Sequence, residues 1–181
     1  VQEFADRFDE KKRRRNMIDF SDMEQFALAI LTRNTEGKIV PSAVAEEYQE
    51  RFAEVMVDEY QDSNLVQETI LTSVSGMSKG RNNMFMVGDV KQSIYRFRLS
   101  RPELFMEKYD TYSVESSPCQ RIDLHKNFRS RKEVLDSTNY LFEKLMFREF
   151  GGIEYDENAA LYAGAEFPPI PEDAVFTDKT E

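Results

Sequence analysis

The sequence predicts an α/β fold in which a parallel sheet is flanked by helices. Two short apolar runs, at 55–57 and 84–87, and a third segment at 121–124 have the length of strands, and helix-compatible segments separate them. Strands that alternate with helices indicate a parallel sheet. All three runs end in polar residues, and such sheets bind ligands at the carboxyl ends of their strands. We therefore expect the chemistry to lie at these ends.

Helices are expected before the first strand. Residues 1–15 are charged and compatible with a helix. A second helix is predicted to begin at Ser21, because Ser21 and Glu24 have the spacing of a capping box. The segment 34–37 is typical of a turn, and 42–51 is predicted to be another helix.

Further helices are expected between and after the strands. They cover 64–77, 102–109 and 131–147, and the second of them has a proline in its first turn. A polar loop is predicted at 78–83. The tail from residue 151 is rich in proline, glycine and acids, so it is predicted to be loop.

Composition excludes several classes of protein. The chain has 181 residues, of which 40% are hydrophobic, enough for one domain or for parts of two. Its net charge of -10 argues against a surface that is basic all over, although a local basic groove is still compatible with DNA binding. Cys119 is the single cysteine, which excludes a disulfide framework and fits a reducing cytoplasm. No run approaches the roughly 20 apolar residues of a membrane span, so no membrane partner is expected.

Two adjacent acids, Asp58 and Glu59, follow the first apolar run. One carboxylate can hold a hydrated Mg²⁺, because this ion keeps several waters and uses few carboxylates. The other can orient or deprotonate an attacking water. An isolated acidic pair is more typical of a solvated turn, so the pair alone does not establish a nucleotide site.

The second run is followed by a glycine and then by aromatic residues that alternate with arginines. Gly88 permits a tight turn, and Gln92 offers an amide that could sense a phosphate or a water. The alternating residues are Tyr95, Arg96, Phe97 and Arg98. Rings that stack on bases and guanidinium groups that meet phosphates suit single-stranded DNA. The alternative is that the rings belong to the core and the arginines pair with surface acids.

Arg129 follows the third run. An arginine just after a strand can reach a transferring phosphoryl group and stabilise the charge that develops on it. The alternative is an ordinary helix boundary with Ser130 as the N-cap.

Taken together and in this order, the clusters resemble motifs of superfamily 1 helicases of the UvrD/Rep type. Residues 58–62 resemble motif II, the Walker B element, and 88–98 resemble motif III. Residues 127–130 resemble motif IV, and 18–22 resemble the short element that enters the first RecA-like domain. The resemblance implies a RecA-like P-loop NTPase fold, here incomplete and made of parts of two lobes.

Finer features resemble the AddA/RexA subunits of bacterial helicase–nucleases. Lys91 precedes Gln92, Phe97 stands where UvrD-type enzymes usually carry tryptophan, and 155–168 resembles AddA after motif IV. This implies part of an ATP-dependent 3′–5′ helicase/nuclease that unwinds and resects DNA double-strand breaks for recombinational repair. It further implies ATP and Mg²⁺ as cofactors, and a place on the bacterial nucleoid. The implied partners are single- and double-stranded DNA and a second subunit of the AddB/RexB type.

The resemblance assigns the nucleotide chemistry to five matched positions. Asp58 would hold Mg²⁺ through water, and Glu59 would be the general base for attack on the γ-phosphate. Gln92 would sense that phosphate. Arg129 would contact it from the second lobe, and Phe128 would lie near the adenine.

Five other positions would meet DNA or couple it to the nucleotide. Tyr95, Phe97 and Arg98 would contact single-stranded DNA. Gln61 and Asp62 would link the nucleotide site to the motor's movement.

The resemblance also predicts the domain organisation. Residues 1–17 would end an inserted helical subdomain, 18–118 would be part of the first lobe, 119–150 would start the second, and 151–181 would lead to another insertion. No Gly-x-x-x-x-Gly-Lys-Thr/Ser loop is present, since the Gly37-Lys38 pair lacks the other residues. We therefore expect an internal fragment that is inactive alone. The alternatives are a UvrD/Rep-type repair helicase without nuclease and a non-catalytic DNA-binding or scaffold protein of the same fold.

Overall fold

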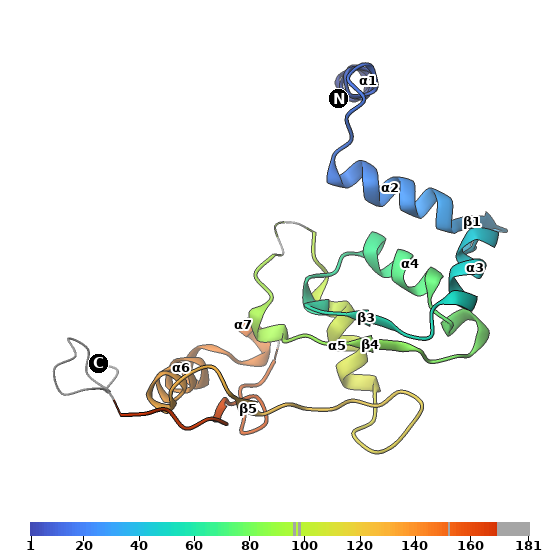
Figure 1. Cartoon of the computed structure of the whole chain (residues 1–181). Helices are drawn as coiled ribbons and strands as arrows, with labels where there is room; N and C mark the ends of the chain where they lie inside the picture. Colours follow the sequence, from blue (N-terminus) through green and yellow to red (C-terminus); the bar gives the residue numbers. More distant parts are fainter. Residues whose placement is uncertain (96, 98, 152, 170–181) are drawn as a thin grey trace. The chain divides into compact units, whose positions relative to one another are not determined.

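The computed structural model describes residues 1–95, 97, 99–151 and 153–169 (Figure 1). The chain divides into two compact units. The first comprises 1–112 with 117–119, and the second comprises 113–116 with 120–181. No helix in the described residues is both long enough and apolar enough to cross a bilayer.

The first unit opens with helices α1 (Gln2–Arg14) and α2 (Phe20–Leu31). Both helices were predicted, but the predicted cap of the second, Ser21 with Glu24, is wrong. The N-cap is Asp19, whose carboxylate accepts a hydrogen bond from the Asp22 amide at 2.9 Å, while the Asp22 carboxylate accepts one from the Asp19 amide at 2.9 Å. Lys12 on α1 favours this earlier cap, because its ammonium donates to Asp22 at 2.6 Å and to Asp19 at 3.2 Å.

A hairpin follows, with strands β1 (Thr32–Thr35) and β2 (Lys38–Pro41) in antiparallel register. The predicted turn at 34–37 is confirmed. Glu36 and Gly37 both have positive φ, 53° and 81°, as two-residue hairpin turns require. The flanking strands were not predicted, because their residues are mostly polar. The predicted helix at 42–51 is confirmed as α3 (Ala43–Arg51), with Ser42 as its N-cap.

The centre of the first unit is a parallel strand pair, β3 (Val55–Val57) and β4 (Met84–Met86) (Figure 1). Helix α4 (Leu65–Val74) and the 3₁₀ turn η2 (Met77–Lys79) connect the strands. The predicted strand–helix–strand unit is therefore confirmed. The two strands are not buried on both faces, however, because the paired residues Met56 and Phe85 remain 71% and 56% exposed.

Three short elements follow the strand ends. The 3₁₀ turn η1 (Tyr60–Asp62) lies after β3, and η3 (Val90–Gln92) lies after β4. Helix α5 (Pro102–Thr111) packs against both turns. Its proline occupies the first turn as predicted, where the missing N–H would have no helical partner.

The second unit contains the parallel pair β5 (Lys126–Asn127) and β6 (Tyr162–Ala163), with helices α6 (Lys132–Leu145) and α7 (Arg148–Gly151). The predicted strand at 121–124 is wrong. No partner strand reaches this segment in the described chain, and the apolar side chains of Ile122 and Leu124 are 68% and 84% exposed. The tail, predicted to be loop, supplies β6 and so completes the pair.

The described chain is thus a mixed α/β structure with two short parallel strand pairs and one hairpin. The parallel pairs agree with the predicted class. Each sheet has only two strands, so the described residues do not form the single three-stranded sheet that was predicted.

The observed cap of α2 can be tested directly. Asp19→Ala removes the acceptor for a free helical amide, which is worth about 1 kcal/mol and corresponds to about fivefold faster local opening. Hydrogen exchange of the peptide covering 20–26 measures this opening. Ser21→Ala is the matched control and should leave exchange unchanged; the reverse pattern would restore Ser21 as the cap.

Candidate functional site

Asp58 and Glu59 lie directly after β3, and both side chains are exposed. The Asp58 carboxylate accepts a hydrogen bond from the Glu59 amide at 2.9 Å. Glu59 adopts the left-handed conformation, with φ 50° and ψ 40°, which costs a residue with a side chain roughly 1–3 kcal/mol. The next amide, of Tyr60, donates to the Val87 carbonyl at 2.9 Å. This bond holds the turn against the end of β4.

Gln61 connects the two strand ends. Its side chain is 1% exposed. Its amide nitrogen donates to Glu59 at 2.7 Å, and its amide oxygen accepts from the Asp89 backbone N–H at 3.0 Å. A Cβ at Gly88 would lie 2.6 Å from that oxygen, so only glycine fits there without displacing Gln61. A buried amide therefore fixes the distance between the acids after β3 and the turn after β4.

Asp89 organises the turn that carries Gln92. Its carboxylate caps η3 by accepting the Lys91 amide at 3.0 Å, and it also accepts the Gln92 side-chain amide at 3.1 Å. The Lys91 ammonium forms an ion pair with Asp89 at 3.0 Å. Asp89 was not predicted as a site residue, although an aspartate after a strand and before a short helix is a typical N-cap signal. Gln92 is exposed and held by this carboxylate.

The carboxylate of Asp62 is incompletely hydrogen-bonded. Within the described residues, its Oδ1 atom is buried without a hydrogen-bond partner. Burial and the nearby charge of Glu59 raise the pKa of Asp62 above its usual value. The ionised form is therefore disfavoured at this position.

The aromatic segment after η3 is exposed. The rings of Tyr95 and Phe97 lie 5.9 Å apart at 51°, and Phe97 is 76% exposed. The neighbouring Ile94 and Leu99 are also exposed, at 69% and 78%. The alternative that these rings are core residues is therefore wrong for this structure. Arg98, which was expected to meet DNA, lies outside the described residues.

The third cluster belongs to the second unit. The Asn127 side chain accepts hydrogen bonds from the amides of Arg129 and Ser130, at 2.9 and 2.8 Å. Arg129 and Phe128 are both exposed. One edge of the Phe128 ring lies close to Gly164, where a Cβ would come within 2.7 Å. The alternative in which Ser130 caps the helix is wrong, since the N-cap is Arg131.

The first unit thus brings together five of the predicted nucleotide and coupling residues, Asp58, Glu59, Gln61, Asp62 and Gln92, around two adjoining strand ends. Phe128 and Arg129 lie in the other unit. Their convergence on the same ligand stays a prediction.

The described residues contain no group of three or more His, Cys, Asp or Glu side chains arranged to hold a metal ion. A hydrated Mg²⁺ does not require such a group, because it keeps most of its waters. Asp58 is exposed at the end of β3, and one of its oxygens accepts a backbone N–H. A single outward-facing carboxylate of this kind fits a water-mediated Mg²⁺ site.

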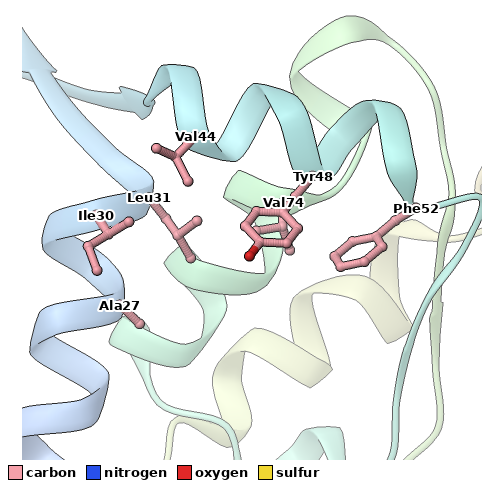
Figure 2. Close-up of a pocket in the computed structure, with 7 residues that line it drawn as sticks. All are labelled: Ala27, Ile30, Leu31, Val44, Tyr48, Phe52 and Val74. Atoms are coloured by element: carbon pink, nitrogen blue, oxygen red, sulfur yellow. The ribbon is translucent and has the colours of Figure 1, made fainter.

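An apolar hollow of about 340 Å³ lies on other elements, between α2, α3 and α4 (Figure 2). Figure 2 shows the seven side chains that line it, Ala27, Ile30, Leu31, Val44, Tyr48, Phe52 and Val74. None of them is a carboxylate, an imidazole, a thiol or a cationic side chain. The hollow is therefore not the place for the predicted chemistry.

Comparison with known families agrees with the helicase resemblance over the part of the chain that contains residues 58–62 and 88–98. Residues 1–113 match the model of the UvrD/REP helicase N-terminal domain. The chain belongs to the UvrD/Rep helicase N-terminal domain family. The matched range includes the acids after β3 and the turn with Gln92 after β4.

Relatives of this UvrD/Rep chain carry a more specific name, that of the A subunit of an ATP-dependent helicase/nuclease. The relative in Lachnoclostridium phytofermentans is 58% identical over 99% of the chain, and the one in Acetivibrio thermocellus is 53% identical over 92%. The protein of that name in Listeria welshimeri is 54% identical over 93%. The resemblance to the AddA/RexA subunits is thereby confirmed. The chain spans 13%, 14% and 13% of the lengths of these relatives.

The bridge made by Gln61 gives a prediction for Gly88. Gly88→Ala places a methyl group against the Gln61 amide oxygen, so the side chain must shift and its hydrogen bonds to Glu59 and Asp89 are lost. Hydrogen exchange should accelerate together in the peptides covering 58–63 and 87–92. Exchange that rises in only one of the two peptides would show that Gln61 does not join them.

Proposed function

We propose that this chain is part of an ATP-dependent DNA helicase–nuclease and carries its water-activating carboxylates. The observation that supports this most is the Gln61 bridge, which holds Glu59 and the Asp89–Gln92 turn at adjoining strand ends. Relatives that are 50–58% identical over at least 92% of the chain carry the name of a helicase/nuclease component. We therefore propose for this chain the activity that the name of these relatives states.

The proposed chemistry is hydrolysis of ATP. Asp58 would hold Mg²⁺ through water, and this ion would neutralise phosphate charge when bound. Glu59 would take the proton from the attacking water, and the bond from Gln61 would orient its carboxylate. Gln92, held by Asp89, would meet the γ-phosphate or the water. Such catalysis depends on positioning and charge stabilisation.

Phe128 and Arg129 would complete the site from the second lobe. Arg129 is exposed, and its backbone is fixed by Asn127, so its guanidinium is able to reach a phosphoryl group. Phe128 is 67% exposed and rests against Gly164, which leaves ring surface for an adenine. Asp62 and Gln61 would pass changes at the phosphate to the rest of the motor.

DNA would bind along the aromatic segment after η3. Tyr95 and Phe97 are exposed beside one another, as rings that stack on unpaired bases must be. Arg98 is included on its sequence position alone. Translocation from 3′ to 5′ along single-stranded DNA would feed unwinding and resection of double-strand breaks. A second subunit of the AddB/RexB type would be the partner, on the bacterial nucleoid in the cytoplasm.

The domain assignment belongs to the same proposal. Residues 18–118 would form part of the first RecA-like lobe and 119–150 the start of the second. Residues 1–17 and 151–181 would join them to inserted subdomains.

Glu59→Gln tests the proposed base in the full-length protein. The substitution keeps the shape and the neighbouring Gln61 but removes the proton acceptor, so ATP turnover should fall by about 100-fold or more, while nucleotide affinity is retained. Steady-state phosphate release and binding of a fluorescent ATP analogue measure the two quantities.

Glu54→Gln is the matched control, because Glu54 is an exposed acid just before β3. It should behave as the wild type. A wild-type protein without turnover would favour the scaffold alternative, and retained turnover in Glu59→Gln would remove Glu59 as the base.

Phe97→Ala tests the DNA segment. Loss of a stacked ring should weaken single-stranded DNA binding by about 1–3 kcal/mol. Fluorescence anisotropy of a labelled oligonucleotide measures this in the full-length protein. Phe4→Ala removes another exposed ring, on α1, and should leave affinity unchanged. Equal affinities for the wild type and both variants would exclude stacking on Phe97.

A further inference from the structure

A largely buried polar cluster, made of Tyr60, Glu68 and Lys108, adjoins the turn that follows Asp58 and Glu59. Tyr60 is 0% exposed, and its hydroxyl donates a short hydrogen bond to Glu68 on α4. Lys108 on α5 donates to the other oxygen of Glu68 at 3.0 Å. The side chains of Lys108 and Glu68 are only 17% and 16% exposed. Three elements therefore meet at one carboxylate.

The lysine also contacts the tyrosine ring itself. The Lys108 ammonium lies 5.0 Å from the centre of the Tyr60 ring, within range of a cation–π interaction. The Phe105 ring packs 6.4 Å from that of Tyr60. Burial and the charge of Glu68 raise the pKa of the Tyr60 hydroxyl, which keeps it a hydrogen-bond donor. The ring is thus fixed at both its face and its hydroxyl.

Tyr60 directly follows Glu59, the residue with the left-handed backbone. A strained conformation persists only where its surroundings over-determine it. The Tyr60 amide is bound to Val87 and its side chain is bound to Glu68, so both ends of Tyr60 are held. Any rotation of Tyr60 would turn the adjoining peptide and with it the Glu59 carboxylate.

Helix α5 adds a link to the aromatic segment. The aromatic segment with Tyr95 and Phe97 leads into the start of α5. There the Arg101 amide donates a hydrogen bond of 2.8 Å to the carbonyl of Ser63, the residue just after η1. Phe105 on the same helix would lie 3.0 Å from a Cβ at Gly88. Helix α5 therefore contacts the acidic turn, the glycine after β4 and the end of the exposed aromatic segment.

We propose that Glu68 and Lys108 are positioning residues for ATP hydrolysis, acting on Glu59 through the side chain of Tyr60. The inference rests on the proposed function and adds two residues outside the three motifs. A buried ion pair adds little net stability compared with apolar packing, because desolvation offsets its attraction. Its hydrogen bonds do fix one geometry, and here the fixed residue adjoins the proposed base.

The test compares Tyr60→Phe and Lys108→Met with Lys108→Arg in the full-length protein. Tyr60→Phe keeps the ring and removes only the hydroxyl, while Lys108→Met keeps an unbranched side chain of nearly the same length and removes the charge. Both should lower kcat for ATP at saturating single-stranded DNA by about tenfold, with KM and DNA affinity within about twofold of the wild type. Lys108→Arg should recover most of kcat. Glu107→Gln, at an exposed position of α5 beside Lys108, is the matched control.

Two results would overturn the proposal. One is a kcat within about twofold of the wild type in both Tyr60→Phe and Lys108→Met. The other is a parallel loss of kcat, DNA affinity and melting temperature, without recovery in Lys108→Arg, which would mean that the cluster only maintains the fold. A wild-type protein without ATP turnover would contradict the proposed function itself, so the two failures are distinguishable.

Discussion

The bridge formed by the Gln61 side chain is the interaction on which this site depends. Parallel pairing of β3 with β4 brings two strand ends together, but pairing alone does not align the residues beyond them. One buried amide binds Glu59 through its nitrogen and the Asp89 backbone through its oxygen. Because both groups are bound to the same planar amide, Glu59 and the turn with Gln92 keep a fixed separation. Gly88 is required for the same reason, since no side chain fits between the turn and that amide.

The site also contains features that oppose stability. Glu59 has a left-handed backbone, and Asp62 has a buried oxygen without a partner in the described chain. Local strain and incomplete pairing of this kind concentrate at functional sites, where the surrounding structure must hold them. Here the surrounding structure is Tyr60, bound to Val87 on one side and to the Glu68–Lys108 pair on the other. The conformation of Glu59 therefore depends on the packing of Tyr60 against these residues.

The elements with strong local signals were predictable from the sequence, and the contacts between them were not. Apolar runs of strand length identified β3 and β4, and Ser42 identified the start of α3. The cap of α2 was assigned to Ser21 because local spacing fitted, whereas Lys12 on another helix favours Asp19. The segment 121–124 was predicted to be a strand, but no strand of the described residues pairs with it, and the pairing involves Lys126 and Asn127 instead. The Gln61 bridge and the Lys108 contact join residues 28 or more positions apart, so spacing along the chain contains no signal for them.

The central claim is that the acids of the first unit and the arginine of the second act on one triphosphate. The most direct measurement is a structure of the full-length protein with ADP, Mg²⁺ and aluminium fluoride, an analogue of the phosphoryl group in transfer. The account predicts that Asp58 lies within one water of the metal, that Glu59 faces the attacking water, and that Gln92 and Arg129 both contact the fluoride group. An analogue bound away from the ends of β3 and β4, or an Arg129 that points away from it, would contradict the account.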